Sequence, residues 1–204
     1  MDTLNQAFET FRKHLEKFIV FTDEEWQLFQ QHSQHKTLKK KEFFIKPNQV
    51  CNEFGFIISG SVRFYHVKDG EEITNYFCLD HEFISSYKSF LTRQPGINYI
   101  QALEATQLIT FTHANLQKML HNDKLAYKME RLLRLIAEHY ICCYEDRLSA
   151  FIIQTPEERY LQLLNSGTHI FQRIPQHYIA QFLGVTPVSL SRIRKRICLP
   201  AVKV

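Results

Sequence analysis

The sequence lacks the features of membrane-spanning and disulfide-bonded secreted proteins. No apolar run approaches the roughly 18 residues that a membrane-spanning helix needs, and the N-terminal segment MDTLNQAFETFRK contains acids and no small-residue cleavage site. The five cysteines are an odd number without Cys-x-x-Cys spacing, which argues against a disulfide framework and a zinc site. We therefore expect a cytoplasmic protein with free thiols, without metal or cofactor.

Acidic residues are absent from the C-terminal part of the chain. From Arg159 onward there are seven Lys and Arg and no Asp or Glu. The formal net charge of +4 hides this segregation, because the preceding residues carry an excess of acid. A positive potential at one end favours a polyanion there. Nucleic acid is the leading candidate.

Glycine and proline are scarce, with six of each, and their positions divide the chain. Two N-terminal helices are predicted by apolar residues at helical spacing and by a capping-box pattern at Thr22 to Glu25. Between residues 37 and 111, short β-rich runs interrupted by Gly and Pro predict a barrel or jelly roll, with a hairpin at Asp69-Gly70. Helical periodicity then returns at 113–121.

Residues 123–153 contain neither glycine nor proline and predict one long helix. Along this helix a row of residues recurs at alternating spacings of four and three, as in the contact seam of a coiled coil. The row consists of Leu125, Met129, Leu132, Ile136, His139 and Cys143, and the predicted seam is Leu125, Met129, Leu132, Ile136 and Cys143. A helix of about 30 residues is roughly 45 Å long, more than a domain of this size covers, so we expect the seam to pair with a second copy. The alternative is a helix lying along the barrel of its own chain.

The segment IPQHYIAQFLGVTPVSLSRIRKR, residues 174–196, predicts a helix-turn-helix. Ala180 is the small residue that lets two helices cross, and Gly184 can adopt the positive φ of the turn. Thr186 is expected to cap the second helix, with Pro187 in its first position. A separate helix is expected after Thr155, starting at Pro156.

The second helix of this unit is expected to present a face suited to the major groove. At 100° per residue, Val188, Arg192 and Lys195 centre the outward face, opposite Leu190 and Ile193. Short side chains ahead of the basic ones permit close approach, and Arg can pair with guanine. The predicted DNA-contacting residues are Gln176, Thr186, Val188, Ser189, Arg192, Arg194, Lys195 and Arg196. The alternative is a helical hairpin with a solvated basic face.

The order of these parts resembles the CRP/FNR family of bacterial transcription regulators. The likeness is carried by EFGFIISGSVRFYHVKDGEE (53–72), ALEATQL (102–108) and IPQHYIAQFLGVTPVSLSRIRK (174–195). It implies an α+β fold with an N-terminal jelly-roll or β-roll sensor domain (1–122), a long dimerisation helix (123–153) and a C-terminal, winged-helix-like helix-turn-helix domain (154–204). The implied function is that of a homodimeric, sequence-specific DNA-binding regulator and not an enzyme. Its expected partners are a double-stranded DNA operator, a small-molecule effector and RNA polymerase.

The resemblance also implies an effector pocket in the β-roll. Family members that bind cyclic AMP carry a Gly-Glu pair and, later, an Arg-Ser or Arg-Thr pair. Ser85-Ser86 and Gly96-Ile97 stand near those places here. A buried phosphate without that Arg lacks its countercharge, and Arg93 could replace it only if the loop is rearranged. We expect weak or no binding of cyclic AMP, and a different ligand lined by Ser85, Ser86, Tyr87, Asn98 and Tyr99.

The cysteine and histidine residues bear on two other ligands and on one other function. Relatives with an iron–sulfur cluster hold it through N-terminal cysteines, whereas the first cysteine here is Cys51. Haem ligation by His66 or His81 stays open. The alternative function is that of a small-molecule-binding or metal cupin-type jelly roll with a basic tail. A metal cupin needs His-x-His with a Glu and a further His, and His66, His81, Glu82 and His113 do not have that spacing.

Overall fold

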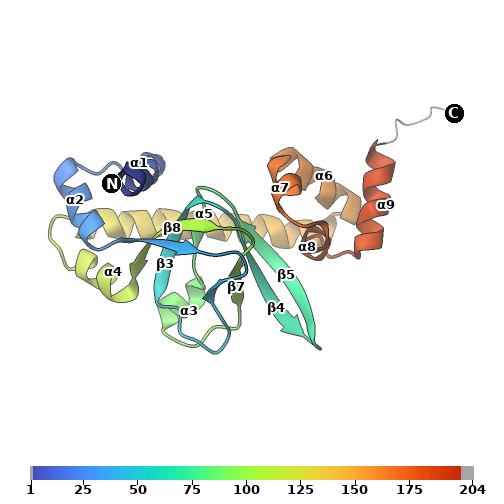
Figure 1. The fold of residues 1–204 in the computed structure, drawn as a ribbon, viewed down its shortest axis with the longest axis horizontal. Helices are drawn as coiled ribbons and strands as arrows, with labels where there is room; N and C mark the ends of the chain where they lie inside the picture. The colour runs from blue at the N-terminus through green and yellow to red at the C-terminus, as the bar shows by residue number, and fades with distance from the viewer. Residues whose placement is uncertain (1, 199–204) are drawn as a thin grey trace. The chain divides into compact units, whose positions relative to one another are not determined.

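The computed structural model describes residues 2–198 and confirms the α+β class (Figure 1). Contacts divide the chain into two compact units. Unit 1 runs to residue 64 and continues over residues 77–140, whereas unit 2 consists of residues 65–76 and the chain from residue 141 onward. The chain thus passes from one unit to the other within strands and within a long helix, and not at the ends of that helix, where we expected the boundaries.

Two helices open the chain as predicted, α1 (Asp2–Leu15) and α2 (Asp23–Gln31). The capping box is present, because the Glu25 amide donates to the Thr22 hydroxyl at 3.3 Å and the Thr22 amide donates to the Glu25 carboxylate at 2.6 Å. Phe11 of α1 is buried and its ring stacks on Phe56 at 4.5 Å between centroids. The helices thereby contribute to the aromatic core of unit 1.

The predicted jelly roll is built from two four-stranded sheets, in the orders β1-β8-β3-β6 and β2-β7-β4-β5. The strands are β1 (Gln34–Leu38), β2 (Phe43–Ile45), β3 (Glu53–Ser59), β4 (Val62–Lys68), β5 (Glu71–Cys78), β6 (Phe83–Ile84), β7 (Tyr99–Ala102) and β8 (Thr106–Thr112). The β1–β8, β2–β7, β3–β6 and β3–β8 pairs are antiparallel. Two short helices accompany the sheets, α3 (Tyr87–Thr92) and α4 (His113–Leu120).

Two turns of the roll depend on positive φ. Asp69 and Gly70 have φ of 54° and 82° and join β4 to β5, which confirms the predicted hairpin. Gly60 has φ of 116°, and a Cβ there would lie 2.5 Å from the Thr106 hydroxyl oxygen. Glycine is therefore required at residue 60 for both backbone conformation and space.

The long helix α5 (Ala126–Ile153) forms as predicted, but the structure corrects the role of its seam. Leu125, Met129, Leu132 and Ile136 are at most 2% exposed within the single chain, and Cys143 is half-buried. These four residues pack into unit 1 and are not available to a second copy. A spacing of three and four fits a helix that packs on its own domain as well as it fits a coiled coil. For these four residues the alternative, a helix lying along the barrel of its own chain, is therefore the better description.

A second apolar row occupies a different face of α5. Its members are between 58% and 73% exposed: Ile141, Tyr144, Leu148 and Ile152. At 100° per residue they fall within an arc of about 80°, centred about 130° around the helix from the buried row. This row was not predicted, because the buried row has the same helical period and accounts for the pattern in the sequence.

The described part of unit 2 contains the rest of α5 and four shorter helices, α6 (Pro156–Ser166), α7 (His169–Arg173), α8 (Gln176–Phe182) and α9 (Pro187–Cys198). Thr155 caps α6 through a capping box with Glu158, and Pro156 begins the helix as predicted. Helix α7 was not predicted, since five residues are too few for apolar spacing to show. The β4–β5 hairpin joins this unit, because the Thr74 amide and hydroxyl both donate to the Gln181 side-chain oxygen, at 3.1 and 2.7 Å.

The cysteines and the helix lengths bear on the expected thiols and on membrane crossing. Cys51, Cys78, Cys142 and Cys143 are free thiols, as expected. Within residues 2–198, no helix is both long and apolar enough to cross a membrane.

Candidate DNA-binding surface and an adjoining cavity

The turn between α8 and α9 has the geometry of a helix-turn-helix. Gly184 has φ of 70°, its amide donates to the Gln181 carbonyl, and the Val185 amide donates to the Ala180 carbonyl, both at 2.9 Å. This is a Schellman motif, in which a left-handed residue lets the chain reverse while the last helical carbonyls stay bonded. Ala180 is fully buried beside Leu183, which agrees with its predicted role at the crossing.

Helix α9 begins with a side-chain cap and separates its two faces cleanly. The Ser189 amide donates to the Thr186 hydroxyl at 3.1 Å, and that hydroxyl donates to Ser189 Oγ at 2.9 Å. Leu190 and Ile193 are 1% and 4% exposed, whereas Val188 is 62% exposed. The hydroxyls of Thr186 and Ser189 are thus engaged in hydrogen bonds at the start of α9. The face of α9 that carries Val188 is exposed.

The remaining side chains predicted to touch DNA differ in their surroundings. Arg192 and Lys195 are exposed on the outward face of α9, and Gln176 is exposed at the start of α8. Arg194 is half-buried. Arg196 is exposed but ion-paired, because its guanidinium donates to the Glu157 carboxylate of α6 at 2.8 Å. The structure therefore brings Val188, Arg192 and Lys195 together, and holds Arg196 at one side.

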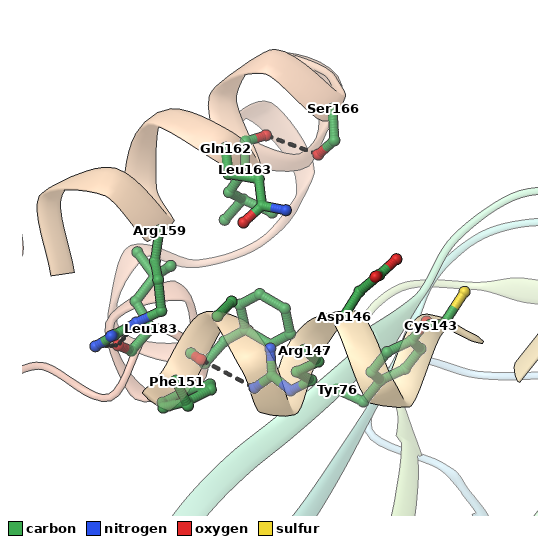
Figure 2. A pocket seen from close by; sticks show the side chains of 12 residues that line it. Tyr76, Cys143, Asp146, Arg147, Phe151, Arg159, Gln162, Leu163, Ser166 and Leu183 are labelled. Carbon is green, nitrogen blue, oxygen red and sulfur yellow. Dashed lines mark hydrogen bonds between the residues drawn. The ribbon is translucent and has the colours of Figure 1, made fainter. Parts of the chain in front are cut away.

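A cavity of about 330 Å³ lies within unit 2, beside the helix-turn-helix. Figure 2 shows Cys143, Asp146, Arg147 and Phe151 along α5, with Gln162, Leu163 and Ser166 on the facing helix α6. Phe182 and Leu183, at the end of α8, complete the lining together with Tyr76, Ala150 and Arg159. The sequence does not reveal this group, because its members come from β5, from α5 and α6, and from the end of α8, which only tertiary packing brings together.

Comparison of the sequence with protein-family models matches residues 35–123 to the cyclic nucleotide-binding domain. Among solved structures, the regulator CLP of Xanthomonas campestris is similar with a TM-score of 0.66 and 15% identity, covering 86% of this chain and 91% of that one. FixK2 of Bradyrhizobium japonicum gives 0.64 and 16%, covering 81% and 84%. The chain has the fold of the CRP/FNR regulators. A protein from Eubacterium rectale described as a regulator of that family gives 0.62 and 18%, covering 87% and 83%. Comparison with curated proteins found no match.

In this CRP/FNR fold, Ser85 and Ser86 come directly before α3, Tyr87 begins it, Asn98 directly precedes β7, and Tyr99 begins that strand. Ser86 is buried, and a Cβ on Gly96 would lie 2.8 Å from its hydroxyl, so the two predicted positions are adjacent. Ser85 and Tyr87 are half-buried beside it. Asn98 and Tyr99 are also half-buried, and the Tyr99 ring lies 5.9 Å from that of Phe43.

Arg93 of the CRP/FNR-type roll is engaged elsewhere. Its guanidinium donates to the carbonyls of Cys51 at 2.7 Å and Phe90 at 3.2 Å, and to the Asn52 side chain at 3.0 Å. A guanidinium held by three oxygens would have to give up these bonds to meet a phosphate. For the metal-binding alternative, residues 2–198 contain no group of three or more His, Cys, Asp or Glu that could hold an ion.

Proposed function

We propose that the protein is a sequence-specific, DNA-binding transcription regulator that acts as a homodimer and responds to an effector other than a cyclic nucleotide. The observation that carries the proposal is the outward face of α9, where Val188, Arg192 and Lys195 are exposed while Leu190 and Ile193 are buried. The similar structures support it, because CLP is described as a global regulator. The charge segregation supports it independently, since no acid follows Glu158.

Arg192 and Lys195 are assigned different tasks on the DNA. Arg192 lies near the centre of the exposed face, one turn after Val188, where its planar fork can pair with a guanine edge and the valine can contact a thymine methyl. Lys195 lies nearly a turn further on and carries a point charge suited to phosphate. Arg192→Ala should therefore cost roughly 1–3 kcal/mol on the specific site only. Lys195→Ala should weaken all sequences alike and lower the salt slope by about 1 for each lost contact.

The test begins with selection of bound duplexes from random DNA by the purified full chain. Each variant is then titrated on the selected duplex and on a scrambled one across a salt series, with Arg131→Ala as a control, because Arg131 is exposed and belongs to unit 1. Failure to enrich any sequence would refute sequence-specific binding. Equal losses on both duplexes for Arg192→Ala would withdraw its base-reading role.

The second apolar row of α5 (Ile141, Tyr144, Leu148 and Ile152) supports the homodimer. Four large side chains at spacings of three, four and four on one exposed helix face form a stripe suited to pairing with an identical helix. A two-fold dimer would also match the two half-sites of a palindromic operator.

Charge placed in this row tests the dimer. The double variant Ile141→Glu, Leu148→Glu should sediment as a monomer at micromolar concentration and lose tight binding to the selected duplex. Ser149→Glu adds one negative charge beside the row, at an exposed residue, and should leave the dimer intact. A monomeric wild-type chain, or a double variant that dimerises normally, would refute this interface.

The engagement of Arg93 supports an effector other than a cyclic nucleotide. Because Arg93 already donates to three oxygens, the charge of a cyclic phosphate near Ser86 and Gly96 would be poorly compensated. Calorimetric titration with cyclic AMP and cyclic GMP should give no heat of binding at micromolar concentrations. Micromolar affinity for either nucleotide would overturn this part of the proposal.

A further inference from the structure

We infer that the cavity of unit 2 is a binding site for a small organic monoanion with a flat apolar body, such as an aromatic carboxylate. The cavity is formed by α5, α6 and the end of α8, with Tyr76 from β5. It is distinct from the predicted effector residues of the β-roll, none of which lines it. At about 330 Å³ it has the size of a site for a small ligand.

The anion preference comes from Arg147. Its guanidinium lies 3.8 Å from the centroid of the Phe182 ring, and one N–H donates to the Phe182 carbonyl at 3.0 Å. A guanidinium has five N–H groups. Among the described residues, the Phe182 carbonyl is the acceptor that the Arg147 guanidinium bonds to. Burial lowers the pKa of Arg147 to about 10, with a further contribution from Arg159. The side chain still carries its charge at neutral pH, and because Arg147 lines the cavity it presents a partly desolvated cation with further N–H donors to a ligand there.

Arg159 adds a second positive charge and is held more firmly. Its Nε and Nη2 donate to the Leu183 carbonyl at 3.3 and 3.0 Å, and its Nη1 donates to the Gln154 carbonyl at 2.6 Å. Among the described residues, neither arginine has a carboxylate partner within ion-pair distance. A carboxylate from a ligand would supply the missing countercharge in bidentate form.

The rest of the lining limits the ligand to one charge and a flat body. Asp146 also lines the cavity, so the formal charge of its ionisable lining is +1, which favours a monoanion over a nucleotide or another polyanion. Phe151, Phe182 and Tyr76 supply aromatic surface, and Arg147 and Arg159 approach the Phe151 ring at 5.0 and 4.6 Å. Planar guanidinium and aromatic groups pack best against a planar ligand.

The test compares 2-naphthoate with its neutral isostere 2-naphthamide by calorimetry on the full chain without DNA, so that its result does not depend on the proposed regulator function. Naphthoate should bind with a Kd below about 1 mM, and naphthamide at least about tenfold more weakly. Arg147→Gln should weaken naphthoate about tenfold or more, whereas Arg131→Gln, an exposed arginine of the same helix, should not change it.

Leu163→Trp provides a second variant that keeps both arginines and fills the space. It should abolish naphthoate binding, and circular dichroism melts check that each variant is folded. If Arg147→Gln does not fold, the inference is still tested by the comparison of naphthoate with naphthamide and by Leu163→Trp. Equal affinity for the two probes, no binding of naphthoate at millimolar concentrations, or binding that survives Leu163→Trp would overturn the inference.

Discussion

Gly184→Ala would place a side chain at the point where the helix-turn-helix reverses. The residue has φ of 70°, and the new Cβ would lie 2.9 Å from Cε1 of Phe151. The left-handed conformation costs an alanine about 1–2 kcal/mol, and turning the Phe151 ring off its rotamer adds about 0.5–1.5 kcal/mol. We therefore expect the free energy of unfolding to fall by about 2–3 kcal/mol.

Gly70→Ala is the matched control, because it separates backbone strain from the contact. Gly70 has φ of 82° and also belongs to unit 2, but a Cβ there would meet nothing within 4 Å. Only the conformational cost of about 1–2 kcal/mol should appear. The difference between the two variants then measures the contact with Phe151, at about 1 kcal/mol.

Urea titrations followed by circular dichroism would give both values, and binding to the selected duplex would report on the turn itself. Gly184→Ala should lose DNA affinity, whereas Gly70→Ala should not. Equal destabilisation by the two substitutions would show that the Phe151 ring moves without cost. An unchanged stability of Gly184→Ala would refute the assignment of a strained turn at this residue.

Three further outcomes are expected. Burial, with repulsion from Lys17 and His81, lowers the pKa of His14 from its ordinary value of 6.5 to about 4. Between pH 6.5 and 4 the unfolded chain therefore binds a proton that folded His14 does not, so the free energy of unfolding should fall as the pH drops through this range. Because His14 is partly exposed, we expect a loss of about 1–2 kcal/mol. In urea titrations, His14→Leu should remove this pH dependence. Gly60→Ala should cost about 3 kcal/mol or more by the same assay, from its φ of 116° and its clash with Thr106. Glu157→Gln should release Arg196 and raise DNA affinity severalfold, with a salt slope steeper by about 1; an unchanged slope would show that the arginine does not reach phosphate.

Local signals in the sequence were sufficient for the features set by neighbouring residues. The capping box at Thr22, the helix start at Thr155, the Asp69-Gly70 hairpin and the Gly184 turn each follow from a few adjacent side chains and their backbone preferences. The two faces of α9 followed from the helical period alone, because one side of a short helix at the edge of a small domain must be buried.

Features that depend on distant segments could not be obtained in this way. The period of α5 was correct, but period does not distinguish a helix that packs on its own domain from one that pairs with another copy. The pairing of Arg196 with Glu157 and the meeting of Arg147 with Phe182 join segments more than thirty residues apart. Their geometry is set by tertiary packing, which leaves no regular spacing in the sequence.

The division of the chain into two units also determines which fragments of the protein contain a complete unit. Its crossings fall inside β4, β5 and α5, so the two units are interleaved along the sequence. A fragment that begins at residue 141 would lack residues 65–76, and with them the Thr74 groups that bond to Gln181. Helices α8 and α9 therefore do not form a module that can be excised or exchanged as one contiguous piece, and a chimera that takes only the C-terminal segment would inherit an incomplete unit.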